Sequence, residues 1–248
     1  MNKKKILITG YPHTGTTILK SKFGECKNVY EVVNEGDIIT HNHISYSGDN
    51  EFVLTKTPVY PIEIRKYGFD WAINNDKSIY KDYHIIIVNR NPYNLFTSII
   101  KRGFNPLSGC KEHLQPAYHH TIEEYLESCK RFLDAQNNNY RNVYTIKYED
   151  FFNNDGQNIK NIMDSIGLQY ESDIFSKRTK NYKINEGLEV PKQEPKVYDY
   201  NGVYRNWQIN QPFKNMNSEV NIPDELSDIL KNSNIIQELG YFDPRTTG

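Results

Sequence analysis

Cysteines are scarce in this sequence, and long apolar runs are missing from it. The 248 residues include three cysteines, Cys26, Cys110 and Cys129, which are odd in number, widely spaced and never arranged as CxxC. This pattern supports neither a disulfide framework nor a zinc knuckle, and it favours reduced thiols in a cytoplasmic compartment. The longest apolar run, at 85–88, is far shorter than the roughly 20 residues that a membrane-spanning helix needs. We therefore expect no segment that crosses a membrane.

An excess of charge of one sign is also missing. Thirty Lys and Arg residues face 31 Asp and Glu residues, so the formal net charge is −1. That balance argues against a uniformly basic protein that coats nucleic acid, although it allows a local basic pocket. Three lysines at 3–5 precede the apolar residues 6–8, but this stretch is too short for a signal-peptide core of about 7–15 residues. We expect a buried first strand there, and a cytoplasmic protein.

Short β-rich apolar runs alternate with helical patterns along the chain. Strands are predicted at 5–9, 29–33, 52–55, 84–89 and 143–148, and helices at 16–23, 92–100, 121–135, 158–166 and 223–239. The alternation predicts an α/β fold with a central, mostly parallel sheet flanked by helices. A long loop or lid is expected at 103–118 and an extended surface excursion at 181–217. With no internal repeat or linker, residues 1–248 are predicted to form a single domain.

The most informative segment is 6–17, in which a strand runs into a turn bounded by Gly10 and Gly15 and then into a helix. Such a turn directs backbone N–H groups and the positive end of the helix dipole at one point, where phosphate or sulfate oxygens bind. Three threonines add hydroxyl donors without a fixed charge: Thr14, Thr16 and Thr17. The glycine spacing is typical of a P-loop, but Thr16 stands where that loop normally has its lysine. An ordinary kinase or NTPase is therefore disfavoured.

A second candidate anion site follows the strand at 84–89. Arg90 comes at the carboxyl end of that strand, where ligands bind in open α/β sheets. Its guanidinium can hold a phosphate with two parallel hydrogen bonds. Ser98, eight residues later in the following helix, could turn its hydroxyl toward the same group. Lys101 and Arg102 are interpreted as solvated charges at the helix end.

Two motifs resemble a known family. Pro12-His13-Thr14-Gly15-Thr16-Thr17 is similar to the 5′-phosphosulfate-binding loop of the PAPS-dependent sulfotransferases, usually Pro-Lys/Arg-Ser-Gly-Thr-Thr. Arg90-Asn91-Pro92 with Ser98 resembles the 3′-phosphate-binding segment of that family, and the motifs follow the family's order. The resemblance implies that 13–17 hold the 5′-phosphosulfate of PAPS and that Arg90 and Ser98 hold its 3′-phosphate. His13 replaces the usual cation; a neutral imidazole could donate one hydrogen bond to the sulfonate, and an imidazolium would restore the charge.

The reacting centre is predicted from the chemistry of sulfuryl transfer and from the same resemblance. Charge develops on the bridging oxygen of the leaving phosphate, which calls for a cation, and the acceptor must lose a proton to a base. Lys56-Thr57-Pro58 resembles the segment of carbohydrate-type sulfotransferases whose lysine contacts the transferring group. Glu35 lies near the place of their catalytic glutamate, and His41 and His43 are rival bases.

Two later segments add expected nucleotide contacts. Tyr148-Glu149-Asp150 resembles the family's Tyr-Glu-Asp segment, whose tyrosine approaches the adenine base. Residues 202–207 are similar to the region that closes over the nucleotide, although Arg205 precedes Trp207 here instead of following it. No metal is expected, because no carboxylate or thiolate completes the His41/His43 or His119/His120 pairs.

These features predict a sulfotransferase that moves a sulfuryl group from PAPS to a hydroxyl or amine of a small-molecule or carbohydrate acceptor. Lys56-Thr57-Pro58 tilts this prediction toward a carbohydrate. No nucleic-acid or membrane partner is expected. One alternative is a P-loop nucleotide-dependent kinase, with Asp37 and Asp150 as nominated Mg²⁺ ligands. The other is a non-catalytic nucleotide-binding module.

Overall fold

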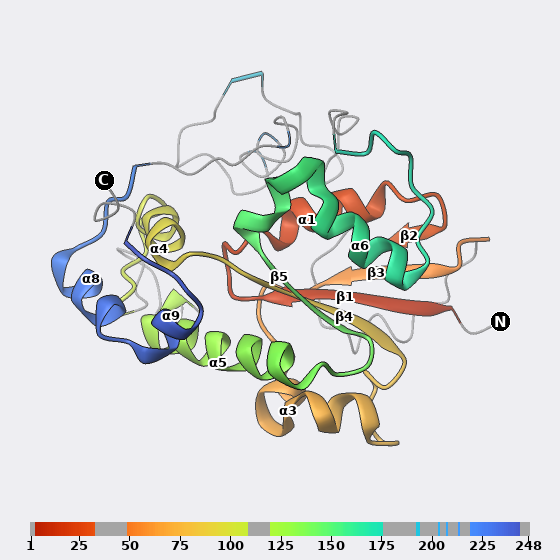
Figure 1. Cartoon of the computed structure of the whole chain (residues 1–248), viewed down its shortest axis with the longest axis horizontal. Coiled ribbons are helices and arrows are strands. Elements are labelled where there is room, and N and C mark those ends of the chain that lie inside the picture. Colours follow the sequence, from red (N-terminus) through yellow and green to blue (C-terminus); the bar gives the residue numbers. More distant parts are fainter. Residues whose placement is uncertain are drawn as a thin grey trace.

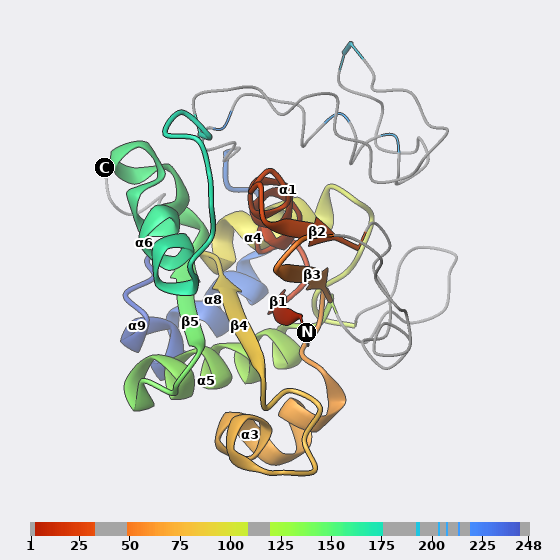
Figure 2. The same ribbon diagram turned by 90° about the vertical axis from the view of Figure 1, so that its right-hand side faces the viewer.

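The computed structural model describes residues 3–32, 49–108, 120–175, 192–193, 203, 207, 213 and 219–243. Within these ranges, five parallel strands form one sheet in the order β2-β3-β1-β4-β5. The strands are β1 (Lys4–Gly10), β2 (Val29–Glu31), β3 (Phe52–Lys56), β4 (Tyr83–Asn89) and β5 (Val143–Lys147). Their order can be followed across the sheet in Figure 2. The predicted α/β fold with a central parallel sheet is confirmed.

The two central strands, β1 and β4, are wholly buried over their apolar cores. Ile6 to Ile8 and Ile85 to Val88 have 0% exposure, as expected for parallel strands that are covered on both faces. The register pairs Gly10 with Val88 and Ile8 with Lys56. The carboxyl ends of β1, β3 and β4 therefore meet at one edge of the sheet, with β1 in the middle.

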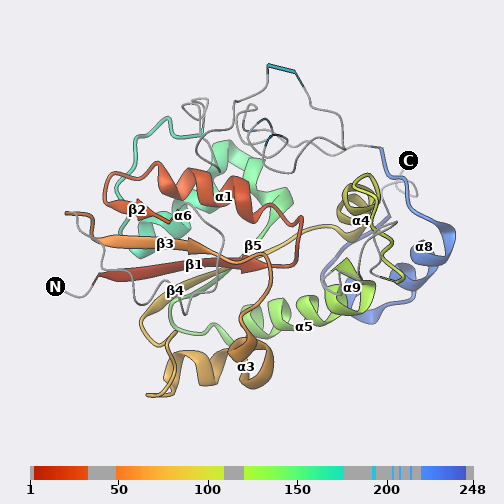
Figure 3. The same ribbon diagram turned by 180° about the vertical axis from the view of Figure 1, so that it is seen from behind.

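Helices cover both faces of the sheet. One face is covered by α1 (Thr16–Gly24), the 3₁₀ segment η2 (Tyr148–Gly156) and α6 (Gln157–Ile166), which pack on Ile6, Ile8, Ile86 and Val88. The other face is covered by five helices that pack on Leu7, Ile85 and Ile87: α3 (Ile62–Asn74), α4 (Pro92–Ile100), α5 (Ile122–Asn138), α8 (Asp224–Lys231) and α9 (Asn234–Glu238). Figures 1 and 3 show α1 and α6 on one side of the sheet and α3 and α5 on the other. Because successive side chains of a strand point to opposite faces of the sheet, they pack into two separate hydrophobic cores.

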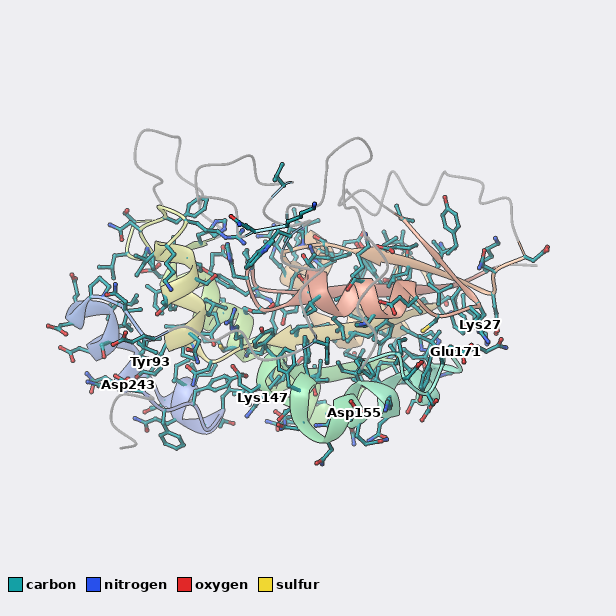
Figure 4. The ribbon with its side chains drawn as sticks, turned by 90° about the horizontal axis from the view of Figure 1, so that it is seen from above. Lys27, Tyr93, Lys147, Asp155, Glu171 and Asp243 are labelled. Carbon is teal, nitrogen blue, oxygen red and sulfur yellow. The ribbon has the colours of Figure 1, made fainter. Side chains whose placement is uncertain are left out.

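The C-terminal helices lie beyond the carboxyl ends of the strands, next to α4 (Figure 1). Lys147, the last residue of β5, donates a hydrogen bond from its Nζ to the carbonyl oxygen of Leu239 at 2.6 Å. The same ammonium lies 4.9 Å from the ring centroid of Tyr241. Figure 4 labels Lys147 at this end of the sheet, far from the Lys27–Glu171 ion pair at the opposite end. The chain end is therefore tied to the sheet edge that carries Arg90.

Two elements differ from the sequence prediction. The helix α3 was not predicted, and Gly68 inside it has φ 81° and ψ 175°, a non-helical kink that interrupts the helical spacing of its apolar residues. The helix predicted at 223–239 is two helices, α8 and α9, because Ser233 between them has extended backbone at φ −86° and ψ 113°. Among the described residues, no helix is both long enough and apolar enough to span a membrane.

Candidate functional site

The turn between β1 and α1 contains positions whose backbone conformation or close contacts admit few residue types. A Cβ added at Gly10 would overlap the carbonyl oxygen of Val88, because β1 and β4 approach closely there. His13 and Gly15 both have left-handed backbone, with φ 67° and 98°. Turns of this kind make successive N–H groups face one concavity, which suits an anion. The turn expected from the sequence is thus present, and its binding of phosphate stays a prediction.

The amino end of α1 leaves its first N–H groups without a side-chain cap. Gly15 occupies the N-cap position, no cap hydrogen bond from a side chain is made, and no acidic residue lies in the first turn, which is described in full. The first N–H groups of a helix have no partner within the helix. Together with the positive end of the helix dipole they form a ready site for phosphate or sulfate.

The three threonines of the turn have different surroundings. Thr14 is wholly buried, and its Oγ1 donates to the carbonyl oxygen of Tyr11 at 2.7 Å, so this hydroxyl holds the turn together. Thr16 is buried in the first turn of α1. The hydroxyl of Thr17 accepts a hydrogen bond from Nζ of Lys56 at 3.0 Å. Thr17 therefore links the turn to the neighbouring strand β3.

Lys56 is the last residue of β3 and is only 3% exposed. Its ammonium reaches the first turn of α1 through the bond to Thr17. The following residue, Thr57, continues the strand pairing, because its N–H donates to the carbonyl oxygen of Ile8 at 3.0 Å. The sequence-predicted cation is thus placed beside the phosphate-binding turn, on the side of β1 where β3 lies.

Arg90 lies on the other side of the turn, at the end of β4. Its Nη1 donates to the carbonyl oxygen of His13 at 3.1 Å, and its guanidinium carbon lies 4.3 Å from the ring centroid of Tyr148. The carbonyl oxygen of Arg90 accepts a hydrogen bond from the hydroxyl of Tyr125 at 2.7 Å. Burial raises the pKa of Tyr125 well above its ordinary value, so this hydroxyl keeps its proton and remains a donor. The backbone beneath Arg90 is therefore held in place.

A half-buried glutamate supports the same strand end. Oε1 of Glu149 accepts a hydrogen bond from the backbone N–H of Asn91 at 2.9 Å, which ties the first turn of η2 to the residue after Arg90. Burial raises the pKa of Glu149, against the smaller lowering contributions of this hydrogen bond and of the Arg90 charge. The hydrogen bond from Glu149 thus helps to hold the backbone next to Arg90, although burial of the carboxylate costs desolvation free energy.

Tyr148 packs against the turn from the η2 side. Its ring, 6% exposed, lies so close to Gly15 that an added Cβ would overlap its Cδ2 atom. The rings of Phe151 and Phe152 lie 5.4 Å and 5.1 Å from it, between centroids. Tyr148 therefore joins Gly15 and Arg90 in one packed unit, and its contact with adenine stays a prediction.

Ser98 lies in α4 and faces a histidine. Its Oγ is 3.5 Å from Nδ1 of His13, so the structure brings His13, Arg90 and Ser98 together as neighbours. The ring of His13 also meets the ring of His120 edge to face, with 5.5 Å between centroids, and His120 stacks on Phe104 at 4.2 Å. His120 and Phe104 were not among the predicted site residues. The sequence shows His120 only as half of an adjacent histidine pair.

Several predicted site residues fall outside the described ranges. Glu35, His41 and His43 belong to 33–48, and Arg205 to 204–206. Trp207 is described and buried, at 8% exposure. Within the described ranges, no group of three or more His, Cys, Asp or Glu side chains is arranged to hold a metal ion.

Comparison with known proteins identifies the family of this chain. A sequence model of the sulfotransferase domain matches residues 3–200. Solved structures that share the fold include the sulfotransferase domain from the curacin biosynthetic pathway, with 13% identity, a TM-score of 0.54 and coverage of 98% of this chain and 99% of that one. The sulfotransferase domain of the Synechococcus PCC 7002 olefin synthase has 11% identity, a TM-score of 0.53 and coverage of 98% of this chain and 97% of that one. Mouse sulfotransferase SULT7A1, complexed with PAP, has 15% identity, a TM-score of 0.54 and coverage of 98% of this chain and 90% of that one. No curated protein sequence matches this chain. Because the domain model covers most of its length, the chain belongs to the sulfotransferase family, and its activity is sulfuryl transfer.

Proposed function

We propose that this protein transfers a sulfuryl group from PAPS to a hydroxyl or amine of an acceptor, and that carbohydrate hydroxyls are the acceptor class. The observation that carries the proposal is the placement of Lys56 and Arg90 on opposite sides of one uncapped phosphate-binding turn. A nucleotide with anionic groups at two separate positions matches two cations separated in this way. The mouse relative with the same fold was solved with PAP.

The residues around the turn fit such a co-substrate. The N–H groups at the start of α1 have no side-chain cap and meet no acidic side chain in that turn, so the 5′-phosphosulfate can take their hydrogen bonds. Residues 13–17 would hold that group, and Arg90 and Ser98 would hold the 3′-phosphate. When bound, PAPS supplies the activated sulfuryl group.

Lys56 is proposed to stabilise charge near the transferred group. Its ammonium is buried and oriented by Thr17, which belongs to the first turn of α1. A cation fixed in advance stabilises the negative charge that grows on the bridging oxygen, without reorganising during the reaction. Lys56 is therefore the proposed catalytic cation.

The proton from the acceptor needs a base, for which we propose Glu35, with His41 and His43 as rivals. In the sequence, all three follow β2, and β2 is the edge strand next to β3, which Lys56 ends. Arg205 is proposed to close over the nucleotide and Tyr148 to approach its adenine. The acceptor class rests on the Lys56-Thr57-Pro58 segment and its likeness to carbohydrate-type enzymes.

The first test is ligand binding. Adenosine 3′,5′-bisphosphate is expected to raise the melting temperature of the full chain more than ADP or ATP does, since a ligand stabilises only the form that binds it. Arg90→Ala should weaken its binding roughly 10- to 100-fold, the range for losing a charge-assisted hydrogen bond. Arg141→Ala is the matched control, because Arg141 is exposed and lies just before the amino end of β5, at the opposite edge of the sheet.

The second test is turnover. Transfer of labelled sulfate from PAPS to a panel of sugars, phenols and steroids should favour the sugars, and Lys56→Met should lower kcat about 10²- to 10³-fold while nucleotide binding is kept. Transfer confined to phenols or steroids would overturn the carbohydrate class alone. Equal binding of the bisphosphate by the native chain and Arg90→Ala would overturn the assignment of the second anion site.

A further inference from the structure

The histidine in the phosphate-binding turn does not face the side of the turn where Lys56 lies. The carbonyl oxygen of His13 is held by Nη1 of Arg90 at 3.1 Å, and Nδ1 of its ring lies 3.5 Å from Oγ of Ser98. Arg90 directly follows β4 and Ser98 belongs to α4, whereas Lys56 ends β3, on the other side of β1. The ring of His13 is therefore a neighbour of the second anion site.

A second histidine extends this arrangement. His120 meets His13 edge to face, with 5.5 Å between ring centroids and 68° between ring planes. Phe104 stacks on His120 at 4.2 Å with an interplanar angle of 3°, which fixes the plane of that ring. Both histidines are partly exposed. Two partly exposed histidines thus lie together, and the ring of one of them, His13, lies beside the hydroxyl of Ser98.

We propose that His13 and His120 are specificity-determining residues that bind the 3′-phosphate of the nucleotide together with Arg90 and Ser98. This inference rests on the proposed use of PAPS, and it moves the His13 side chain from the transferred sulfonate to the opposite end of the nucleotide. A neutral imidazole offers a phosphate one N–H donor, while an imidazolium offers a charge and two donors. The pair would therefore recognise a phosphate monoester most strongly when it is protonated.

The expected consequence is a pH-dependent preference for the 3′-phosphate. Histidine has an ordinary pKa of about 6.5, and a phosphate monoester loses its second proton near pH 6. Slightly acid solution therefore combines a dianion with imidazolium rings, and a rise in pH removes the ring charges while the phosphate stays charged. Charged groups on the elements around the pair are Arg90 at the end of β4, Lys101 and Arg102 after α4, and Glu123 and Glu124 in the first turn of α5. Glu149 also belongs to this set: its Oε1 accepts the N–H of Asn91, next to Arg90, and burial raises its pKa. Substitution of each histidine is therefore needed to assign the change to the imidazoles.

The test compares two nucleotides that differ only in the 3′-phosphate. Dissociation constants of adenosine 3′,5′-bisphosphate and adenosine 5′-monophosphate are measured by calorimetry on the full chain between about pH 6 and about pH 8. The ratio of the two constants cancels the titration of the shared 5′-phosphate. In the native chain, the preference for the bisphosphate should fall about tenfold across this range, a typical value for losing one charge-assisted hydrogen bond.

Variants then assign the effect. His13→Asn keeps a residue that adopts left-handed backbone readily, and His120→Gln keeps a polar side chain. Each should flatten the pH dependence of the preference. His84→Gln is the control, because His84 lies at the amino end of β4, with its Nδ1 3.3 Å from the hydroxyl of Tyr144, and should leave the dependence intact.

A second measurement needs no variant. In NMR titrations of the native chain, the bisphosphate should raise the pKa of two histidines and the monophosphate should not, because a bound dianion favours imidazolium. A preference that is independent of pH, or that both variants retain in full, would overturn the histidine assignment and leave the proposed function standing. If the native chain shows no preference for the bisphosphate at any pH, the proposed use of PAPS itself is wrong.

Discussion

The packing of Tyr148 on the phosphate-binding turn can be probed with one methyl group. In Gly15→Ala, the new Cβ would overlap Cδ2 of Tyr148 and would lie 3.0 Å from its Cε2 and 3.2 Å from Cε2 of Phe151. The Tyr148 ring has little room to retreat, since it is buried under the Arg90 guanidinium and beside Phe152. The substitution therefore tests whether the turn, η2 and Arg90 form one packed unit.

The expected loss of stability has two parts. An L-residue at the left-handed φ of Gly15, 98°, costs roughly 1–2 kcal/mol. Forcing a methyl group into a filled site costs about 1–3 kcal/mol more. The free energy of unfolding should therefore fall by roughly 2–5 kcal/mol, a large share of the stability of a typical domain.

Gly167→Ala separates the two parts. Gly167 caps α6 with φ 89° and ψ 33°, a backbone close to that of Gly15, yet an added Cβ would meet nothing within 4 Å. This control should lose only the backbone part, about 1–2 kcal/mol. Both variants are compared with the native chain by urea unfolding, with the free energy and the slope fitted separately.

The comparison has a clear refuting outcome. If Gly15→Ala is destabilised no more than Gly167→Ala, then Tyr148 does not pack on the turn as described. A double variant, Gly15→Ala with Tyr148→Leu, should recover part of the loss relative to the sum of the single changes, because the smaller side chain removes the overlap.

Two further predictions concern the elements around the site. Because burial raises the pKa of Glu149 in the folded chain, its contribution to stability is fully present below about pH 4.3 and is lost as pH rises through the folded-state pKa. Glu149→Gln keeps an acceptor for the Asn91 N–H, so urea unfolding should show its stability relative to the native chain rising between about pH 4 and about pH 7; a difference that does not vary with pH contradicts this. Thr121 caps α5 by accepting the N–H of Glu124 at 3.3 Å, so Thr121→Ala should cost about 1 kcal/mol while Thr121→Ser costs much less. Equal losses in the two variants would show that the cap is not responsible.

The phosphate-binding turn could be predicted because all its determinants are contiguous. Residues 6–17 carry the apolar strand, the two glycines and the start of the helix, and each acts on its own stretch of backbone. The same holds for the helix cap at Thr121, where donor and acceptor are three residues apart. Local sequence also showed that strands and helices alternate, which is enough for the fold class.

Helix α3 escaped prediction for a local reason as well. Gly68 breaks its helical spacing, and what holds the element is contact of Ile64, Phe69 and Ala72 with one core of the sheet. Propensity and spacing carry no information about such contacts, because the partners lie elsewhere in the chain.

The amino-acid sequence alone was enough to name the candidate anion-binding parts, which are a turn, a lysine and an arginine. The tertiary structure decided how they meet. Lys56 reaches Thr17 across 39 positions, and Arg90 reaches His13 across 77, because the strand order places β3 and β4 on either side of β1. The same packing turns the His13 ring toward Ser98 and brings His120 beside it. Side-chain direction at a turn depends on these distant neighbours, so no pattern of nearby residues specifies it.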